Sequence, residues 1–156
     1  DAYNQVRANK GSAGIDGITI DEIDDYLRKH WRSTKELIKQ RKYKPQPVLR
    51  VEIPKPNGGV RQLGIPTVMD RMIQQAIVQV ISPICEPYFS EKSYGFRPNR
   101  SCEQAVIQLL EYLNDGYEWI VDIDLEKFFD TVPQDRLMSL VHNIIQDGDT
   151  ESLIRK

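Results

Sequence analysis

Two stretches of the chain alternate apolar and polar residues with the period of a β-strand. Residues 48–53 and 60–65 each run into a proline. Between them lies Asn57-Gly58-Gly59, a combination that favours a tight hairpin turn. The pattern predicts a basic antiparallel hairpin over residues 46–66.

Elsewhere the apolar residues repeat with the period of a helix. Thr67 and Asp70 form a capping signal for a long helix over 67–86, with an apolar stripe wide enough for a buried helix. Ser101 and Gln104 form a second capping box, which opens a helix to about residue 114. Further helices are expected over 2–6, from about 21 to 27, over 33–41, and after Pro133, the last with Leu137, Leu140, Val141, Ile144 and Ile145 on its core side.

The stretch Glu118–Leu125 predicts a further strand. Side chains alternate between the two faces of a strand, so Asp122 and Asp124 share one face. Two carboxylates on a strand otherwise this apolar need a counter-charge, from a divalent metal ion or from basic side chains. The alternative is a salt-bridged pair at the end of the strand. Helices mixed with antiparallel strands, without regular β-α alternation, indicate the α+β class.

Composition places the chain among ordinary globular proteins. It has 156 residues, of which 40% are hydrophobic and 28% are charged. These values exclude collagen-like, low-complexity and disordered chains. No apolar run is long enough to cross a bilayer, the first residues lack the pattern of a signal peptide, and two cysteines are too few for a disulfide scaffold. We therefore expect a cytoplasmic protein that is not secreted and does not contact a membrane.

The net charge of −2 conceals an asymmetry along the chain. Residues 39–75 carry eight basic and two acidic side chains, whereas residues 111–156 carry four basic and eleven acidic ones. A cationic segment followed by an anionic one is typical of an anion-binding surface beside a cation-binding surface. The alternative is that both segments are solvent-exposed faces without a ligand, which would give the same distribution of charge.

Four blocks, in order along the chain, resemble the reverse transcriptases encoded by group II introns. Residues 9–17 (NKGSAGIDG) resemble the N-terminal block of the bacterial retroelement type, and residues 53–66 (IPKPNGGVRQLGIP) resemble the fingers hairpin. Residues 93–101 (SYGFRPNRS) resemble the next fingers block, and residues 124–130 (DLEKFFD) resemble the first catalytic motif of the palm. The resemblance implies a right-hand polymerase fold, with fingers over residues 1–110 and the start of the palm over 111–156.

The resemblance also implies a catalytic role for Asp124. This carboxylate would bind both Mg²⁺ ions of a two-metal site, and the backbone carbonyl of Leu125 would assist one of them. Two such ions clamp the attacking and the departing oxygens in nucleotidyl transfer. Phe129 would lie against the sugar of the incoming nucleotide and exclude a 2′-hydroxyl. Packing in the protein core is the alternative for Phe129, and it is the preferred reading for Phe128.

Lys55 and Arg61 flank the hairpin turn and, by the same resemblance, would bind the triphosphate of the incoming dNTP. Arginine can bind phosphate through two nitrogens, whereas lysine acts as a point charge. In an anonymous hairpin they would be two solvated charges.

Two further groups are expected near the RNA template. Arg97 and Asn99 lie in an irregular segment before a capped helix, and a buried structural role is the alternative for Arg97. Asn9, Lys10 and Gly11 would belong to an N-terminal loop over the template.

The function expected from these motifs is RNA-directed DNA polymerisation by a group II intron protein that also binds its intron RNA and assists splicing as a maturase. Its partners would be template and intron RNA, a DNA primer or target, and dNTPs. A non-catalytic RNA-binding maturase is one alternative, and a diversity-generating or CRISPR-associated reverse transcriptase is another. The second palm motif, Tyr-x-Asp-Asp, is not in the sequence, so we expect these 156 residues alone to be inactive, and their exposed apolar surface to favour a homodimer.

Overall fold

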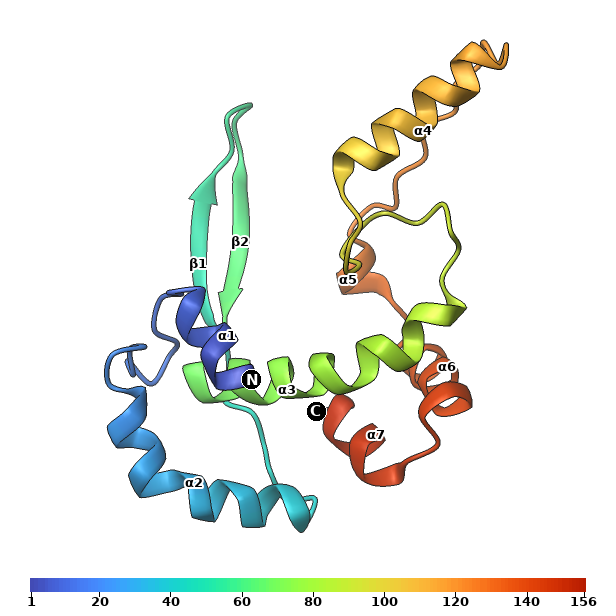
Figure 1. Cartoon of the computed structure of the whole chain (residues 1–156). Helices are drawn as coiled ribbons and strands as arrows, with labels where there is room; N and C mark the ends of the chain where they lie inside the picture. Colours follow the sequence, from blue (N-terminus) through green and yellow to red (C-terminus); the bar gives the residue numbers. More distant parts are fainter.

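A computed structural model describes the whole chain, residues 1–156. Its centre is one long helix, α3 (Val68–Cys85), from whose two ends the other elements extend (Figure 1). A two-stranded hairpin rises from the N-terminal end of α3, and a helical arm rises on the same side beyond its C-terminal end. The α+β class predicted from the sequence is confirmed. No helix in the structure has the length and apolar character that a membrane span requires.

The hairpin has the position and the pairing predicted. Strands β1 (Leu49–Pro54) and β2 (Val60–Ile65) are antiparallel and pair only with each other. The turn is closed by the amide of Gly58, which donates to the carbonyl of Lys55 at 3.1 Å. Gly58 and Gly59 both have φ of +82°, a backbone region that is open to glycine and strained for other residues.

The start of α3 confirms the predicted cap. The Thr67 hydroxyl accepts a hydrogen bond from the Asp70 amide at 3.1 Å, and it donates to the Asp70 carboxylate at 2.6 Å. Only the first turns of the helix are buried, namely Val68, Met69, Asp70 and Ile73. The prediction of a helix buried along its length was therefore wrong, because its C-terminal half finds few packing partners within the chain.

The N-terminal region contains two helices, α1 (Ala2–Ala8) and α2 (Ile23–Lys39). The sequence predicted separate helices up to 27 and over 33–41, but α2 is continuous. No glycine or proline interrupts residues 23–39, so nothing in the backbone requires a break. The turn-rich segment between α1 and α2 packs against α3, where a Cβ on Gly14 would lie 2.7 Å from the backbone of Thr67.

After α3 come a short 3₁₀ helix, η1 (Glu86–Tyr88), an irregular loop, and α4 (Cys102–Asn114). The predicted capping box is present at α4: the Ser101 side chain accepts from the Gln104 amide, and the Gln104 side chain accepts from the Ser101 amide. The proposed boundary between fingers and palm, after residue 110, falls inside this helix. That division stays a prediction.

The strand predicted over residues 118–125 is absent from the structure, so that prediction was wrong. Residues 117–126 form no strand, and all of them are exposed. A strand is defined by hydrogen bonds to a neighbouring strand, and β1 and β2 pair only with each other. The alternation of Trp119 to Leu125 is present in the sequence, but nothing else in the structure pairs with it.

The C-terminal region consists of three helices: α5 (Phe128–Thr131), α6 (Gln134–Ile145) and α7 (Gly148–Ile154). Helix α7 was not predicted, although Asp147 caps it by accepting from the Thr150 amide at 2.8 Å. The expected core side of α6 is only partly realised. Leu137 and Leu140 are exposed, at 46% and 56%, whereas Val141, Ile144 and Ile145 are less exposed and none of them is fully buried.

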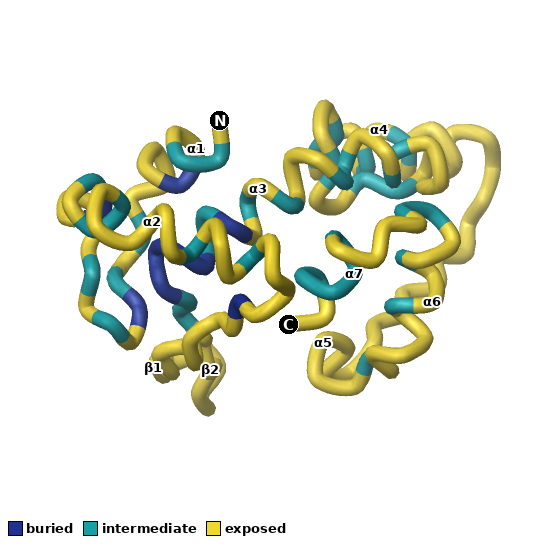
Figure 2. The backbone as a smooth tube through the Cα atoms, turned by 90° about the horizontal axis from the view of Figure 1, so that it is seen from below, coloured by how far each residue is buried: buried dark blue, intermediate teal, exposed yellow.

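The buried residues gather around the N-terminal end of α3, as Figure 2 shows. One cluster joins Val6, Ile23 and Val68, so that it ties α1 and α2 to α3. A second cluster, which we call the Tyr43 cluster, comprises Tyr43, Met69 and Ile73, with Leu153 of α7 packed against it. The rest of the chain extends from this small core.

Candidate nucleotide and nucleic-acid interface

The hairpin carries its two candidate phosphate ligands near its turn. In the strand register Ile53 lies opposite Arg61, and Val51 opposite Leu63. Residues that lie opposite each other, and those two apart along a strand, share a face. The Arg61 side chain therefore lies beside the apolar residues Val51, Ile53 and Leu63, and Lys55 follows directly after β1, where its amide donates to the Gly59 carbonyl at 3.1 Å.

This face is free to accept a ligand. Its apolar residues Val51, Ile53 and Leu63 are 36–44% exposed. None of the ion pairs in the structure includes Lys55 or Arg61, so no carboxylate of the chain neutralises them. An apolar strip that ends in two unpaired cations is suited to a ligand with one flat apolar part and one anionic part.

Asp124 lies in the irregular segment before α5. Asp122 and Asp124 are both exposed, and the only ion pair nearby joins Glu126 to Lys127 at 3.8 Å. No group of three or more His, Cys, Asp or Glu side chains is arranged to hold a metal ion. The residues present therefore do not form a magnesium site by themselves, and Asp124 with the carbonyl of Leu125 supplies part of one at most.

Phe129 lies in α5, directly after the segment that carries Asp124. Its ring is 91% exposed, and it meets Phe128 edge-on with the two ring centres 5.7 Å apart. Phe128 is about half exposed. The preferred interpretation of Phe128 as a core residue was therefore wrong, because α5 finds too few packing partners in the chain to bury the ring, and Phe129 is the more exposed of the two.

The N-terminal loop with Asn9, Lys10 and Gly11 is attached to the start of α3 by an arginine that sequence reasoning counted only as a charge. Arg71 donates to the carbonyl of Ser12 at 2.6 Å, and a Cβ on Gly11 would collide with its guanidinium. Lys10 has φ of +47° and is exposed. The loop is thereby held close to the base of the hairpin, and its glycine allows the close approach.

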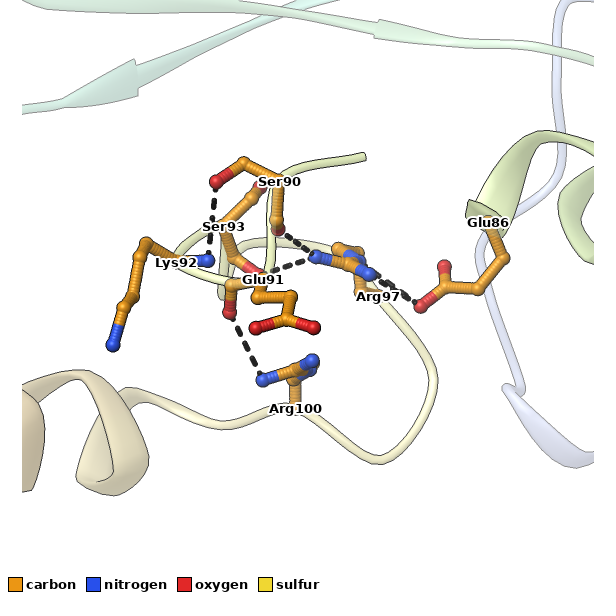
Figure 3. A network of polar contacts seen from close by, with 7 residues as sticks. All are labelled: Glu86, Ser90, Glu91, Lys92, Ser93, Arg97 and Arg100. Carbon is orange, nitrogen blue, oxygen red and sulfur yellow. Dashed lines mark hydrogen bonds and ion pairs between the residues drawn. The ribbon is translucent and has the colours of Figure 1, made fainter. Parts of the chain in front are cut away.

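Arg97 is held by the chain itself. Its side chain is 7% exposed and forms an ion pair with Glu86 at 2.7 Å (Figure 3). This is the arrangement of a structural arginine, the alternative that the sequence left open. Asn99, two residues later, is exposed and has φ of +59°.

The candidate residues thus fall into three separate groups. The hairpin cations and the N-terminal loop lie at one end of α3, and the loop with Asn99 lies beyond the other end. Asp124 and Phe129 form the third group, and no hydrogen bond or ion pair joins them to the hairpin.

A family model described as reverse transcriptase (RNA-dependent DNA polymerase) matches residues 53–155, which include the hairpin, the loop before α4, and α5. The chain belongs to the reverse transcriptase family. The matched part contains the hairpin cations, Asp124 and Phe129, whereas the N-terminal loop lies before it.

Individual relatives extend the similarity to nearly the whole chain. A group II intron-encoded protein, LtrA, of Lactococcus lactis subsp. cremoris is 36% identical over 156 residues, which is 99% of this chain. A putative COX1/OXI3 intron 2 protein of Saccharomyces cerevisiae is 36% identical over 158 residues, again 99% of this chain. The protein YkfC of Escherichia coli is 36% identical over 147 residues, or 92% of this chain. The chain spans 26%, 18% and 39% of the lengths of these relatives, respectively.

Proposed function

We propose that this chain is the nucleotide-binding and template-binding part of a group II intron-encoded RNA-directed DNA polymerase. The observation that carries the proposal is the exposed apolar hairpin face, which has two unneutralised cations near the turn. A dNTP has the matching chemistry, because its base has flat faces and its triphosphate is anionic. The names of two relatives, both intron proteins, support the group II intron assignment.

In this proposal Lys55 and Arg61 bind the triphosphate, and Phe129 lies against the sugar. The exposure of the Phe129 ring supports this role, since an aromatic side chain can exclude a 2′-hydroxyl only if its surface is available to the nucleotide. Asp124 and the Leu125 carbonyl contribute ligands to a two-ion magnesium site, for which further oxygen ligands must come from the nucleotide and from carboxylates outside these residues.

The RNA partners of the proposal are the template and the intron that encodes the protein. The N-terminal loop with Asn9, Lys10 and Gly11 contacts the template, and the loop with Asn99 contacts it beyond the other end of α3. Intron binding assists splicing, as expected of a maturase. We further propose a cytoplasmic protein, and self-association of the isolated 156 residues through their exposed apolar side chains.

The test is primer extension by the intact protein on an RNA template with Mg²⁺ and dNTPs. Wild-type protein is expected to extend the primer, and Asp124→Asn is expected to abolish extension while it leaves the Kd for RNA within about twofold, because the substitution removes a metal ligand and no RNA contact. Asp115→Asn is the control, as an exposed acidic residue at the end of α4, and it should extend normally.

Absence of extension by the wild-type protein would refute the polymerase proposal. If the protein nevertheless binds and promotes splicing of its intron RNA, the non-catalytic maturase is the correct function. Normal extension by Asp124→Asn would instead refute the role of Asp124.

A further inference from the structure

The loop between η1 and α4 is cross-linked by one buried arginine. Arg97 donates from Nε and Nη2 to the Glu86 carboxylate at 3.0 and 2.7 Å. Its Nη1 donates to the carbonyls of Ser90 and Ser93 at 2.5 and 2.9 Å, as Figure 3 shows. One guanidinium therefore joins the start of η1 to the middle of the loop, so the loop has a defined shape although it contains no regular structure.

A second arginine adds another cross-link and leaves a charge at the surface. Arg100 donates to the carbonyl of Glu91 at 3.1 Å, and its guanidinium lies 5.5 Å from the centre of the Tyr94 ring. No carboxylate pairs with Arg100, in contrast to Arg97 with its partner Glu86. The loop surface therefore keeps one positive charge that the chain does not neutralise.

Phe96 is the large apolar side chain that this loop leaves fully exposed. Its exposed fraction is 109%, the highest among the large apolar side chains of the protein. Its backbone is left-handed, with φ of +55°, which is an unusual conformation for a bulky residue. The neighbouring Gly95 would adopt it easily but does not. Strained backbone of this kind persists where the surroundings enforce it, and it concentrates at functional sites.

The surroundings of Phe96 favour a nucleic acid over a protein as its partner. The residues that flank it in the loop are Gly95, Arg97, Pro98 and Asn99, none of which is a large apolar side chain. Phe96 alone is too small for an apolar protein interface, which requires a continuous patch, and its immediate neighbours do not extend it into one. The same loop carries the guanidinium of Arg100, which pairs with no carboxylate, and the exposed amide of Asn99, and proteins use these side-chain types together with an aromatic ring to bind single strands.

We propose that Phe96 is a stacking platform for an unpaired base of the bound RNA, and that Arg100 contacts a neighbouring phosphate. Arg97 is a positioning residue in this site: it touches no RNA but holds the loop that presents the ring. The inference rests on the proposed function, since it assumes that the protein binds single-stranded template. It adds a specific contact at Phe96 to the template-binding role of this loop.

The test compares Phe96→Ala, Phe96→Leu and Phe96→Trp in the intact protein. Leucine keeps the apolar character without a π-face, and tryptophan keeps the π-face. Stacking on one base contributes enough that its loss raises the Kd for a single-stranded RNA by about tenfold. We expect that increase for the Ala and Leu variants, a Kd within about twofold of wild type for Trp, and no change in Kd for fully paired duplex RNA. Arg100→Ala should reduce the salt dependence of binding by about one phosphate contact.

Melting temperatures distinguish stacking from packing. If Phe96 stacks on RNA, the Ala and Leu variants melt within about 2 °C of wild type, because the ring contacts nothing in the free protein. Wild-type binding by Phe96→Leu, an equal loss of affinity on duplex RNA, or a large drop in melting temperature would each overturn the inference. Primer extension by the wild-type protein is measured in parallel. Its absence refutes the proposed function, whereas normal extension with unaltered Kd for Phe96→Leu refutes the stacking role alone.

Discussion

The hydroxyl of Tyr43 supports a prediction about the stability of the fold. Tyr43 is 8% exposed and donates to the carboxylate of Asp70, which is 2% exposed and lies in the first turn of α3. The same carboxylate accepts from the Thr67 hydroxyl at 2.6 Å and from the Gln46 amide at 3.2 Å. Tyr43→Phe removes one of three donors and leaves the aromatic ring to pack as before.

The expected cost follows from the charge on the acceptor. A hydrogen bond to an ionised group contributes about 1.5–3 kcal/mol, more than a bond between neutral groups. Because the phenyl ring fills the same space, no cavity term is added. We therefore expect Tyr43→Phe to lower the free energy of unfolding by about 1.5–3 kcal/mol.

Urea denaturation of the intact protein measures this difference. Tyr88→Phe is the matched control, since Tyr88 is 68% exposed and its hydroxyl forms no hydrogen bond. The control should unfold within about 0.5 kcal/mol of wild type. If Tyr43→Phe also lies within that range, the hydroxyl does not stabilise the fold and the reasoning is refuted.

The same pair predicts a dependence on pH. Burial raises the pKa of Tyr43 above its ordinary value of 10.0, and the hydrogen bond to Asp70 and the charge of that carboxylate raise it further. The unfolded chain therefore loses the tyrosine proton first as pH rises. The stabilisation is present in full below pH 10 and decreases above it, by up to about 1.4 kcal/mol per pH unit. The difference in unfolding free energy between wild type and Tyr43→Phe should shrink between pH 9 and 11, and a constant difference would contradict the assignment.

Three further predictions concern the hairpin, the sugar contact and the N-terminal loop. Arg61→Ala should raise the KM for dNTPs about tenfold or more, because a charged contact is lost, whereas Arg50→Ala, on the opposite face of the hairpin, should leave the KM unchanged. Equal effects of the two substitutions on the KM would contradict the role of the Arg61 face in binding the triphosphate. Phe129→Ala should admit ribonucleotides in primer extension while Phe128→Ala keeps their exclusion, and strict exclusion by both variants would remove Phe129 from the sugar site. Gly14→Ala should lower the free energy of unfolding by about 1–3 kcal/mol, because the new Cβ would meet the backbone of Thr67 at 2.7 Å; Ala13→Gly, one position earlier, is the control for the loop, and an unaltered stability of Gly14→Ala would show that the loop can shift at no cost.

Features defined by nearby residues could be predicted from the sequence. The hairpin follows from Asn57-Gly58-Gly59 between two alternating runs, and the starts of α3 and α4 follow from capping residues three positions apart. Hairpin turns and helix caps involve residues only a few positions apart, so a short stretch of sequence is enough to predict them.

Features that depend on distant partners could not be predicted. The alternation in residues 118–125 indicates a strand, but a strand needs a neighbour, and the chain supplies none. Likewise, the sequence around Arg97 does not reveal that its guanidinium forms an ion pair with Glu86, eleven positions earlier. The exposure of Phe96 and its left-handed backbone leave no mark in the sequence, because phenylalanine is not a residue that such a conformation favours.

The docking of α7 on the Tyr43 cluster has a consequence for synthesis of the protein. Arg41 forms an ion pair with Asp149 across 108 residues, and Leu153 packs against Tyr43 and its neighbours. A ribosome adds about 5–20 residues per second, so Arg41 and Tyr43 emerge about 5–20 s before their partners in α7. During that interval Tyr43 lacks its contact with Leu153, and the docking of α7 completes the Tyr43 cluster.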